Sequence, residues 1–183
     1  MLEKLFSLIE NLDRRKQLHL LSSHKNTMLA GSPKIGTNNK FLLYPNLQKV
    51  SIGKDFDIRN SVHIIVHNNA TLEIGNNVFL NNFCSINCLE QISIGENTLF
   101  GENVKIYDHN HQYERTENGL KVSHSEFTKS AVMIGKNCWL GSNVTVLKGV
   151  TIGDNCIIGS GCTIYKDIPD NSKVVNSQEL KFL

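Results

Sequence analysis

The chain has 183 residues, of which 40% are hydrophobic and 20% are charged, and its formal net charge is +2. This length suits one domain, or a domain with a small appendage, the composition is ordinary for a soluble protein, and the presence of only three prolines argues against a disordered or Pro-rich chain. Because the net charge is small and no basic block occurs, we expect no nucleic-acid partner.

The first segment of the chain is predicted to be an α-helix over residues 2 to about 21. Its apolar residues recur at the three- and four-residue spacing of one helix face, at Leu2, Leu5, Ile9 and Leu12. Such a helix caps the main domain, or it binds a partner or a membrane surface. Residues 22–34 follow as a predicted linker, so that helix and linker together make a segment 1–34.

The N-terminus lacks the basic region, the apolar run and the small-residue cleavage site of a signal peptide. No window of the sequence approaches the ~18 apolar residues of a membrane span. We therefore expect a cytoplasmic protein, with membrane contact that is peripheral at most.

From residue 50 onward, aliphatic and aromatic residues recur every six positions. A period of six fits neither a helix nor a coiled coil, but it fits a short strand followed by a tight corner. Three such hexapeptides make one triangular coil, and parallel pairing stacks successive coils ~4.8 Å apart. Strand alternation buries the repeated positions, which are Ile52, Ile58, Ile64, Ile74, Leu80, Ile86, Ile94, Phe100, Ile106, Ile134, Leu140, Val146, Ile152, Ile158 and Ile164.

Asparagine or glycine often stands three residues after the repeated position, where a corner needs a left-handed backbone. The next residue is predicted to point inward, and four of the five cysteines occupy that slot, at Cys84, Cys138, Cys156 and Cys162. These cysteines are expected to be small core residues in a reducing compartment. No zinc-type spacing occurs, and His67 and His109 fall two coils apart, too far for one ion, so we expect no metal site.

The rhythm of six stops after "IYDHNH" and resumes at Ile134. His109 stands at a corner slot and is predicted to be a corner residue that lines a site, whereas His111 is predicted to face outward at the root of a loop, 112–133. Trp139 is the only tryptophan. It occupies an outward slot in the coil after the loop, which indicates a subunit contact or a ligand wall.

These repeats resemble those of the hexapeptide-repeat acyltransferases, which are left-handed parallel β-helices. The stretches "ENVKIYDHNH" and "IGKNCWLGSNVTVLKGVTIGDNCIIGSGCTIYKDIPDN" are similar to the sugar O-acetyltransferases, such as the maltose and galactoside acetyltransferases and their relatives in capsule and O-antigen gene sets. The resemblance implies an all-β fold, a left-handed parallel β-helix over 35–171 with one long protruding loop, an N-terminal helix before it and a tail, 172–183, after it. The tail lacks the arginine of the maltose and galactoside enzymes, which favours the polysaccharide-modifying branch.

The resemblance also implies a site. It matches His111 to the catalytic histidine and Asn82 to the acceptor-site asparagine, and acetyl-CoA would be held in a groove between the subunits of a homotrimer. The positions that match the acetyl-CoA contacts are Ser142, Ser160, Tyr165 and Lys166.

Acetyl transfer to a sugar hydroxyl needs a base for the hydroxyl proton and donors for the developing oxyanion. We expect His111 to be the base, oriented by Asp108 or by Glu114, with backbone N–H groups around Gly141 and Ser142 as donors. Direct transfer to a sugar or polysaccharide hydroxyl is the main hypothesis. The alternatives are N-acetylation of an amino sugar nucleotide and a non-catalytic β-helix assembly protein.

Overall fold

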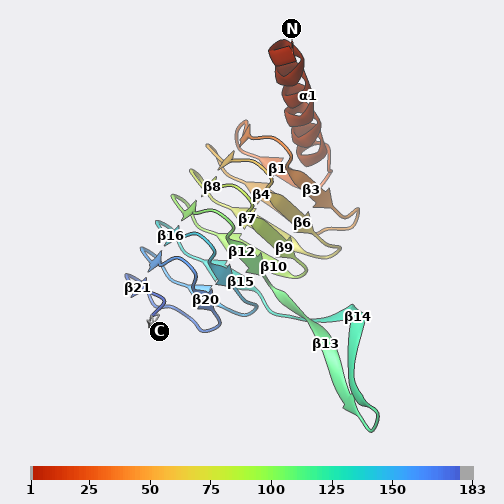
Figure 1. Ribbon diagram of the computed structural model, residues 1–183, viewed down its shortest axis with the longest axis vertical. Coiled ribbons are helices and arrows are strands. Elements are labelled where there is room, and N and C mark those ends of the chain that lie inside the picture. The colour runs from red at the N-terminus through yellow and green to blue at the C-terminus, as the bar shows by residue number, and fades with distance from the viewer. Residues whose placement is uncertain (1, 178–183) are drawn as a thin grey trace, which may run out of the picture.

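The computed structural model describes residues 2–177 of the chain, so residues 178–183 of the predicted tail lie outside the described part. One helix, α1 (Leu2–Ser22), precedes a stack of triangular coils, and a two-stranded hairpin projects from the stack (Figure 1). No helix among the described residues is long and apolar enough to cross a membrane.

The coils contribute one strand each to three parallel sheets, here called A, B and C. Sheet A consists of β1 (Thr27–Leu29), β4 (Lys49–Ile52), β7 (Thr71–Ile74), β10 (Gln91–Ile94), β15 (Val132–Ile134) and β18 (Thr151–Ile152). Sheet B consists of β2 (Lys34–Ile35), β5 (Asp57–Ile58), β8 (Phe79–Leu80), β11 (Leu99–Phe100), β16 (Trp139–Leu140), β19 (Ile157–Ile158) and β21 (Lys173–Val174). Sheet C consists of β3 (Lys40–Leu43), β6 (His63–Val66), β9 (Ser85–Cys88), β12 (Lys105–Tyr107), β17 (Thr145–Val146) and β20 (Thr163–Ile164).

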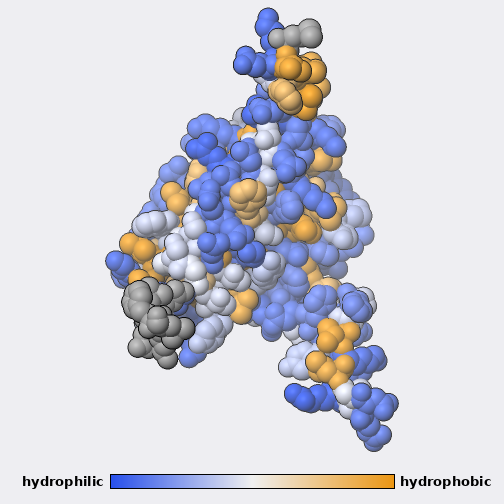
Figure 2. Space-filling model, in the orientation of Figure 1, coloured by the Kyte–Doolittle hydropathy of each residue, from blue (hydrophilic) through white to orange (hydrophobic). Residues whose placement is uncertain are grey.

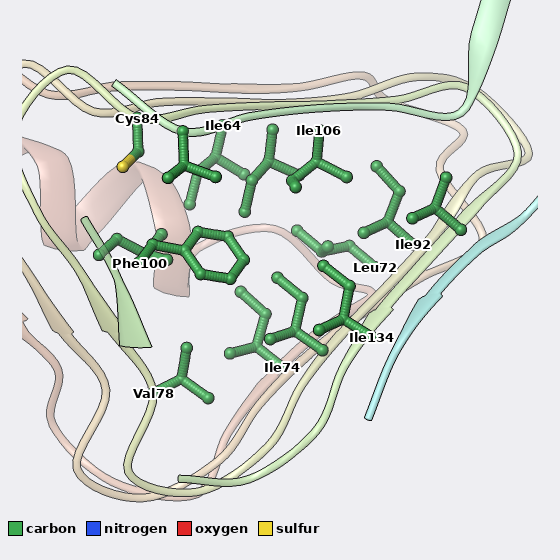
Figure 3. Packing of buried hydrophobic residues seen from close by; sticks show 14 of the residues in the cluster. Ile64, Leu72, Ile74, Val78, Cys84, Ile92, Phe100, Ile106 and Ile134 are labelled. Carbon is green, nitrogen blue, oxygen red and sulfur yellow. The ribbon is translucent and has the colours of Figure 1, made fainter. Parts of the chain in front are cut away.

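The predicted all-β, left-handed parallel β-helix with an N-terminal helix is confirmed, and its core is the one that the period of six predicts. Every repeated aliphatic or aromatic position from Ile52 to Ile164 is buried inside the tube. Figure 3 shows Phe100, Leu72 and Ile106 pointing into the space between the three sheets. All five cysteines are free and buried, so the four predicted core cysteines are confirmed and Cys88 joins them.

The corners have the left-handed backbone that the asparagines and glycines predict. Asn77, Asn97, Asn137 and Asn155 have φ between 54° and 58° and follow sheet A in successive coils. Their side chains form a ladder in which each amide nitrogen donates to the side-chain oxygen of the asparagine in the next coil, at 3.0–3.1 Å. The corners are therefore stabilised by hydrogen bonds that run along the stack.

The β-helix begins earlier than the sequence predicts. The predicted linker 22–34 contains β1, which pairs with β4 in parallel register from Thr27↔Val50 to Leu29↔Ile52. The inward positions of this coil, Leu29, Ile35 and Phe41, keep the spacing of six and pair with Ile52, Ile58 and Ile64. The end of the coil is covered by α1, so Leu21 of the helix is buried against the core.

The loop predicted over 112–133 does protrude from the coils, but it has regular secondary structure. The segment is an antiparallel hairpin of β13 (His109–Thr116) and β14 (Gly119–Lys129), which leaves the corner between sheets C and A and extends away from the coils (Figure 1). None of its residues belongs to the hydrophobic core. The hairpin therefore adds a surface to the β-helix without supporting the fold of the tube.

Candidate active site

The root of the hairpin is anchored by a buried carboxylate. Asp108 has 0% exposure, and its side chain accepts hydrogen bonds from the backbone N–H groups of Leu89 (2.9 Å) and Glu90 (2.7 Å) and from the Nδ1 of His109 (3.1 Å). Burial alone would raise the pKa of Asp108, but the hydrogen bonds from His109, Leu89 and Glu90 hold that pKa below its usual range. Asp108 is thus a buried carboxylate whose hydrogen bonds join the root of the hairpin to the preceding coil.

His109 is not the corner residue that the sequence predicts. It begins β13, it is not one of the residues with positive φ, and its side chain is only 11% exposed. Its ring packs edge-on against Tyr107 and Phe127, with centroid distances of 6.1 and 5.3 Å. Because Nδ1 donates to Asp108, the ring is held in place, and its predicted contact with substrate stays a prediction.

His111 is the exposed histidine of the pair. Its Nδ1 lies 2.9 Å from the backbone carbonyl oxygen of Ser123, and its ring packs on Phe127 at a centroid distance of 4.7 Å. A carbonyl oxygen only accepts, so Nδ1 carries a proton, and in the neutral imidazole Nε2 then keeps its lone pair. The ring is therefore oriented and in the tautomer that a general base requires.

The acceptor that orients His111 is neither of the carboxylates that the sequence offers. Asp108 bonds to His109, and the Glu114 carboxylate pairs with the Lys121 ammonium at 3.0 Å. The Ser123 carbonyl reaches His111 because the hairpin register shifts between His111 and Tyr113, which bulges residues 123–126 out of β14. The side-chain oxygen of Ser123 accepts from the N–H groups of residues 125 and 126 and closes this bulge.

His111 also lines a cavity of about 490 Å³ on one side of the hairpin. The other lining residues are Asn110, Gln112, Tyr113, Thr128 and Lys148. A second cavity of about 310 Å³ lies within the bulged hairpin but does not include His111. Phe127 and Ser123 have no signature in the repeat pattern, because the hairpin places them, whereas Lys148 lies in the corner between β17 and β18.

Three of the predicted binding residues lie in one column at the corner between sheets B and C. Asn82, Ser142 and Ser160 each stand two residues after a strand of sheet B, in three of four successive coils. Glu102 completes the column, since it accepts from the side-chain amide of Asn82 (3.2 Å) and its N–H donates to the Ser142 hydroxyl (3.2 Å). The coil register thus aligns the predicted acceptor residue with the predicted acetyl-CoA contacts.

Gly141 permits the close approach of this column. A Cβ on Gly141 would meet the backbone nitrogen and the hydroxyl of Ser160 at 2.7 Å. Its own N–H, however, donates to the carbonyl of Ile158 (2.7 Å), so it is committed to coil pairing. The N–H of Gly141 is therefore not free to stabilise an oxyanion, and the N–H of Ser142 remains the candidate donor.

Phe83 lies at the same corner and was not among the residues predicted for the site. Its side chain is 61% exposed and its φ is 63°, at a position where the following coils have Asn103 and Asn143. A left-handed backbone is costly for a bulky residue, and strain of this kind concentrates at functional sites. Its position directly after Asn82 places an exposed aromatic ring beside the predicted acceptor residue.

The remaining predicted residues lie elsewhere on the tube. Trp139 is 53% exposed on the outer face of sheet B, as predicted. Tyr165 is exposed just after β20, at the corner between sheets C and A, and the Lys166 ammonium lies over its ring at 5.6 Å. Within one chain the predicted site is thus divided, with His111, Tyr165 and Lys166 along one corner and Asn82, Ser142 and Ser160 along another.

Among residues 2–177, no group of three or more His, Cys, Asp or Glu side chains is arranged to hold a metal ion. His67 stacks on Tyr44 at a centroid distance of 4.3 Å. Burial and the neighbouring His109 lower the pKa of His67, which is a packed corner histidine.

Residues 131–166 match the protein family described as bacterial transferase hexapeptide (six repeats). This segment of the chain therefore carries hexapeptide repeats. It is similar to the putative lipopolysaccharide biosynthesis O-acetyl transferase WbbJ of Escherichia coli K12, with 28% identity over 68% of this chain and 66% of the relative. It is also similar to nodulation protein L of Rhizobium meliloti, with 41% identity over 58% of this chain and 56% of that protein.

These hexapeptide-repeat relatives are longer than the matched region, since the chain spans about two thirds or less of their length. Among solved structures, a mutant of AntD, an N-acyltransferase from Bacillus cereus in complex with coenzyme A and an amino sugar nucleotide, aligns with a TM-score of 0.63. That alignment covers 85% of this chain and 81% of the other at 14% identity, which establishes a shared fold.

Proposed function

We propose that this protein transfers an acetyl group from acetyl-CoA to a hydroxyl of a sugar or polysaccharide repeat unit, with His111 as the general base. The observation that carries the proposal is the hydrogen bond from His111 Nδ1 to the Ser123 carbonyl, which leaves Nε2 free at a cavity of about 490 Å³. The similarity to a protein named as a lipopolysaccharide O-acetyl transferase supports a sugar hydroxyl as the acceptor.

In this mechanism the hydroxyl oxygen attacks the thioester carbonyl carbon while Nε2 of His111 takes the hydroxyl proton. The tetrahedral intermediate then collapses, the C–S bond breaks, and the proton passes to the departing thiolate of CoA. A positioned general base contributes roughly 10²- to 10⁴-fold to such a step. No acetyl-enzyme is needed, because burial raises the pKa of the Cys84 thiol to about 11 and all five cysteines lie inside the tube.

The divided site supports assembly into a homotrimer. His111 and the column of Asn82, Ser142 and Ser160 lie at different corners of one tube. In a ring of three copies, the C–A corner of one chain faces the B–C corner of the next, and the hairpin would reach across the groove between them. Acetyl-CoA would lie in that groove beside Trp139, with Tyr165 and Lys166 contributed by the chain that supplies His111.

The direct test is the His111→Ala variant, compared with His63→Ala, a control that removes an exposed histidine from the outer face of sheet C. We expect kcat of His111→Ala to fall by at least ~10²-fold while acetyl-CoA still binds in calorimetry, and His63→Ala to keep full activity. Turnover near the wild-type rate in His111→Ala would exclude this histidine as the base.

The acceptor class is tested separately by measuring thiol release from acetyl-CoA with matched hydroxyl and amine acceptors. A hydroxyl acceptor should support turnover, whereas turnover with the amine alone would assign the protein to N-acetylation. Failure to bind CoA would favour a non-catalytic assembly protein.

A further inference from the structure

The N-terminal half of α1 projects beyond the coils with an uncovered apolar face. Figure 2 shows the hydrophobic residues gathered at the projecting end of the molecule. By contrast, the C-terminal half covers the end of the tube and buries Gln17 and Leu21. The uncovered side chains are each 52–66% exposed, and they are Leu2, Leu5, Phe6, Leu8, Ile9 and Leu12.

The apolar residues of this half follow a heptad. Leu2 and Ile9 occupy position a, Leu5 and Leu12 occupy position d, and Phe6 and Leu8 occupy the flanking positions e and g. All the intervening residues are polar, and they fall at positions b, c and f: Glu3, Lys4, Ser7, Glu10 and Asn11. An a/d seam alone suits a pair of helices, whereas an apolar stripe extended to e and g suits a helix that contacts two others.

The charge of this segment argues for a protein surface instead of a lipid surface. Residues 2–12 carry two acidic side chains, Glu3 and Glu10, and one basic side chain, Lys4. Helices that lie on membranes have a polar face rich in Lys and Arg, which this face lacks. An isolated helix of about this length is also marginal in water, so the segment needs a packing partner to be stable.

The place where the helix leaves the coils favours another copy of this chain as that partner. The carboxylate of Asp13 accepts from the N–H of Asn38 (2.7 Å) at the corner between sheets B and C, and Arg14 lies in a groove with β2 and β5 of sheet B. Sheet B also carries the exposed Trp139. The helix therefore leaves from the face on which the proposed trimer would form, and rotation about a symmetry axis would bring equivalent helices together in parallel.

We propose that residues 2–12 of α1 pair with the same residues of other copies and form a parallel helix bundle at the end of a homo-oligomer. The helix would then act as an assembly element that holds the coils of different chains at one end, independently of the acetyl-transfer chemistry.

Variants of the full-length protein that each introduce one cysteine on α1 test this proposal. All five native cysteines are buried, so an introduced surface thiol reports without interference from them. Leu5→Cys places a thiol at a d position, where parallel, in-register helices meet, and Ser7→Cys places one at f, on the outside. A disulfide needs Cα atoms about 4.4–6.8 Å apart, which only the d position would offer.

Under mild oxidation at micromolar concentration, we expect Leu5→Cys to give disulfide-linked dimers at least ~10-fold faster than Ser7→Cys, and this difference to vanish in denaturant. Circular dichroism of both variants should match the wild type, since neither residue lies in the core. Equal cross-linking of the two variants in buffer overturns the proposal. So does the absence of Leu5→Cys cross-links, and so does cross-linking of Leu5→Cys chains to Leu12→Cys chains alone, which would indicate antiparallel helices.

Discussion

At the scale of single residues, Asp108 determines how the hairpin joins the coils. It is a charged group with no exposure, and three donors satisfy its two oxygens. Removing one member of such a buried set costs more free energy of folding than the loss of one ordinary hydrogen bond, because a buried donor is left without a partner. The geometry of His109, and through Phe127 that of His111, therefore depends on this carboxylate.

We expect Asp108→Asn to lower the free energy of unfolding by roughly 1–3 kcal/mol at neutral pH, because the amide has one acceptor oxygen where the carboxylate has two. The folded-state pKa of Asp108 is depressed, so its contribution is present above the unfolded value of about 3.9 and is lost as the pH falls through the folded value. Denaturant unfolding between pH 3 and 7 should therefore show the difference between wild type and variant shrinking with acid.

The control for this prediction is Asp55→Asn, at an exposed corner position whose φ of 56° an asparagine accepts. Its stability should stay within ~0.5 kcal/mol of the wild type over the same pH range. A loss for Asp108→Asn that stays constant down to pH 3 would show that packing, and not ionisation, explains the effect.

The sequence predicts the outward position of His111 but does not predict the group that orients its ring. The position of His111 follows from counting sixes from Ile94 to Ile106, because strand and corner geometry are local. Its hydrogen-bond acceptor is the backbone carbonyl of Ser123, twelve residues away, and any residue type carries such a carbonyl. Only the bulge of the hairpin brings the two together, so the orienting group is not an acidic side chain that the sequence could indicate.

At the scale of elements, the hairpin is the part of the fold that interrupts the repeat. Its signal is present in the sequence, because the turn-forming pair Asn118-Gly119 lies between two short stretches that alternate side chains on the two faces of a strand. Tyr113 and Arg115 share one face before the turn, and Leu120 and Val122 share one face after it. The structure pairs Tyr113 with Val122 and Thr116 with Gly119. The polar composition hid this signal, because exposed strands lack the buried stripe that makes the coils recognisable.

Replacing Tyr113–Val122 with Asn-Gly removes the outer hairpin and keeps His111, Ser123 and Phe127. Because none of the removed residues belongs to the hydrophobic core, we expect the midpoint of denaturant unfolding to stay unchanged within error. The acceptor KM should rise by ~10-fold or more while the KM for acetyl-CoA stays the same, since the cavity beside His111 loses Tyr113 from its lining. Steady-state kinetics with each substrate varied in turn would measure this, and an unchanged acceptor KM would remove the outer hairpin from acceptor binding.

At the scale of the whole molecule, the three outer faces of the tube differ in character. Sheet B presents directly paired apolar residues at its outer positions, namely Phe79, Leu99, Trp139 and Ile157. The corresponding outer positions of sheet C in the same coils are mostly polar, at Ser85, Lys105, Thr145 and Thr163. An apolar ladder on one face of a tube indicates the surface through which copies associate. The sequence showed Trp139 as an outward aromatic but could not show the ladder, because its members come from separate coils.

We expect Leu99→Glu to disrupt assembly, because it places a charge at the middle of the apolar ladder, next to Trp139, where association would remove it from water. In sedimentation equilibrium the wild type should have three times the 20.5 kDa mass of the chain, and Leu99→Glu should have the mass of one chain at micromolar concentration. Thr163→Glu, at an exposed outer position of sheet C, adds the same charge and should keep the wild-type mass. Activity should fall with assembly, because His111 and Asn82 would no longer meet across a subunit boundary. A trimeric Leu99→Glu variant with wild-type activity would assign the interface to another face.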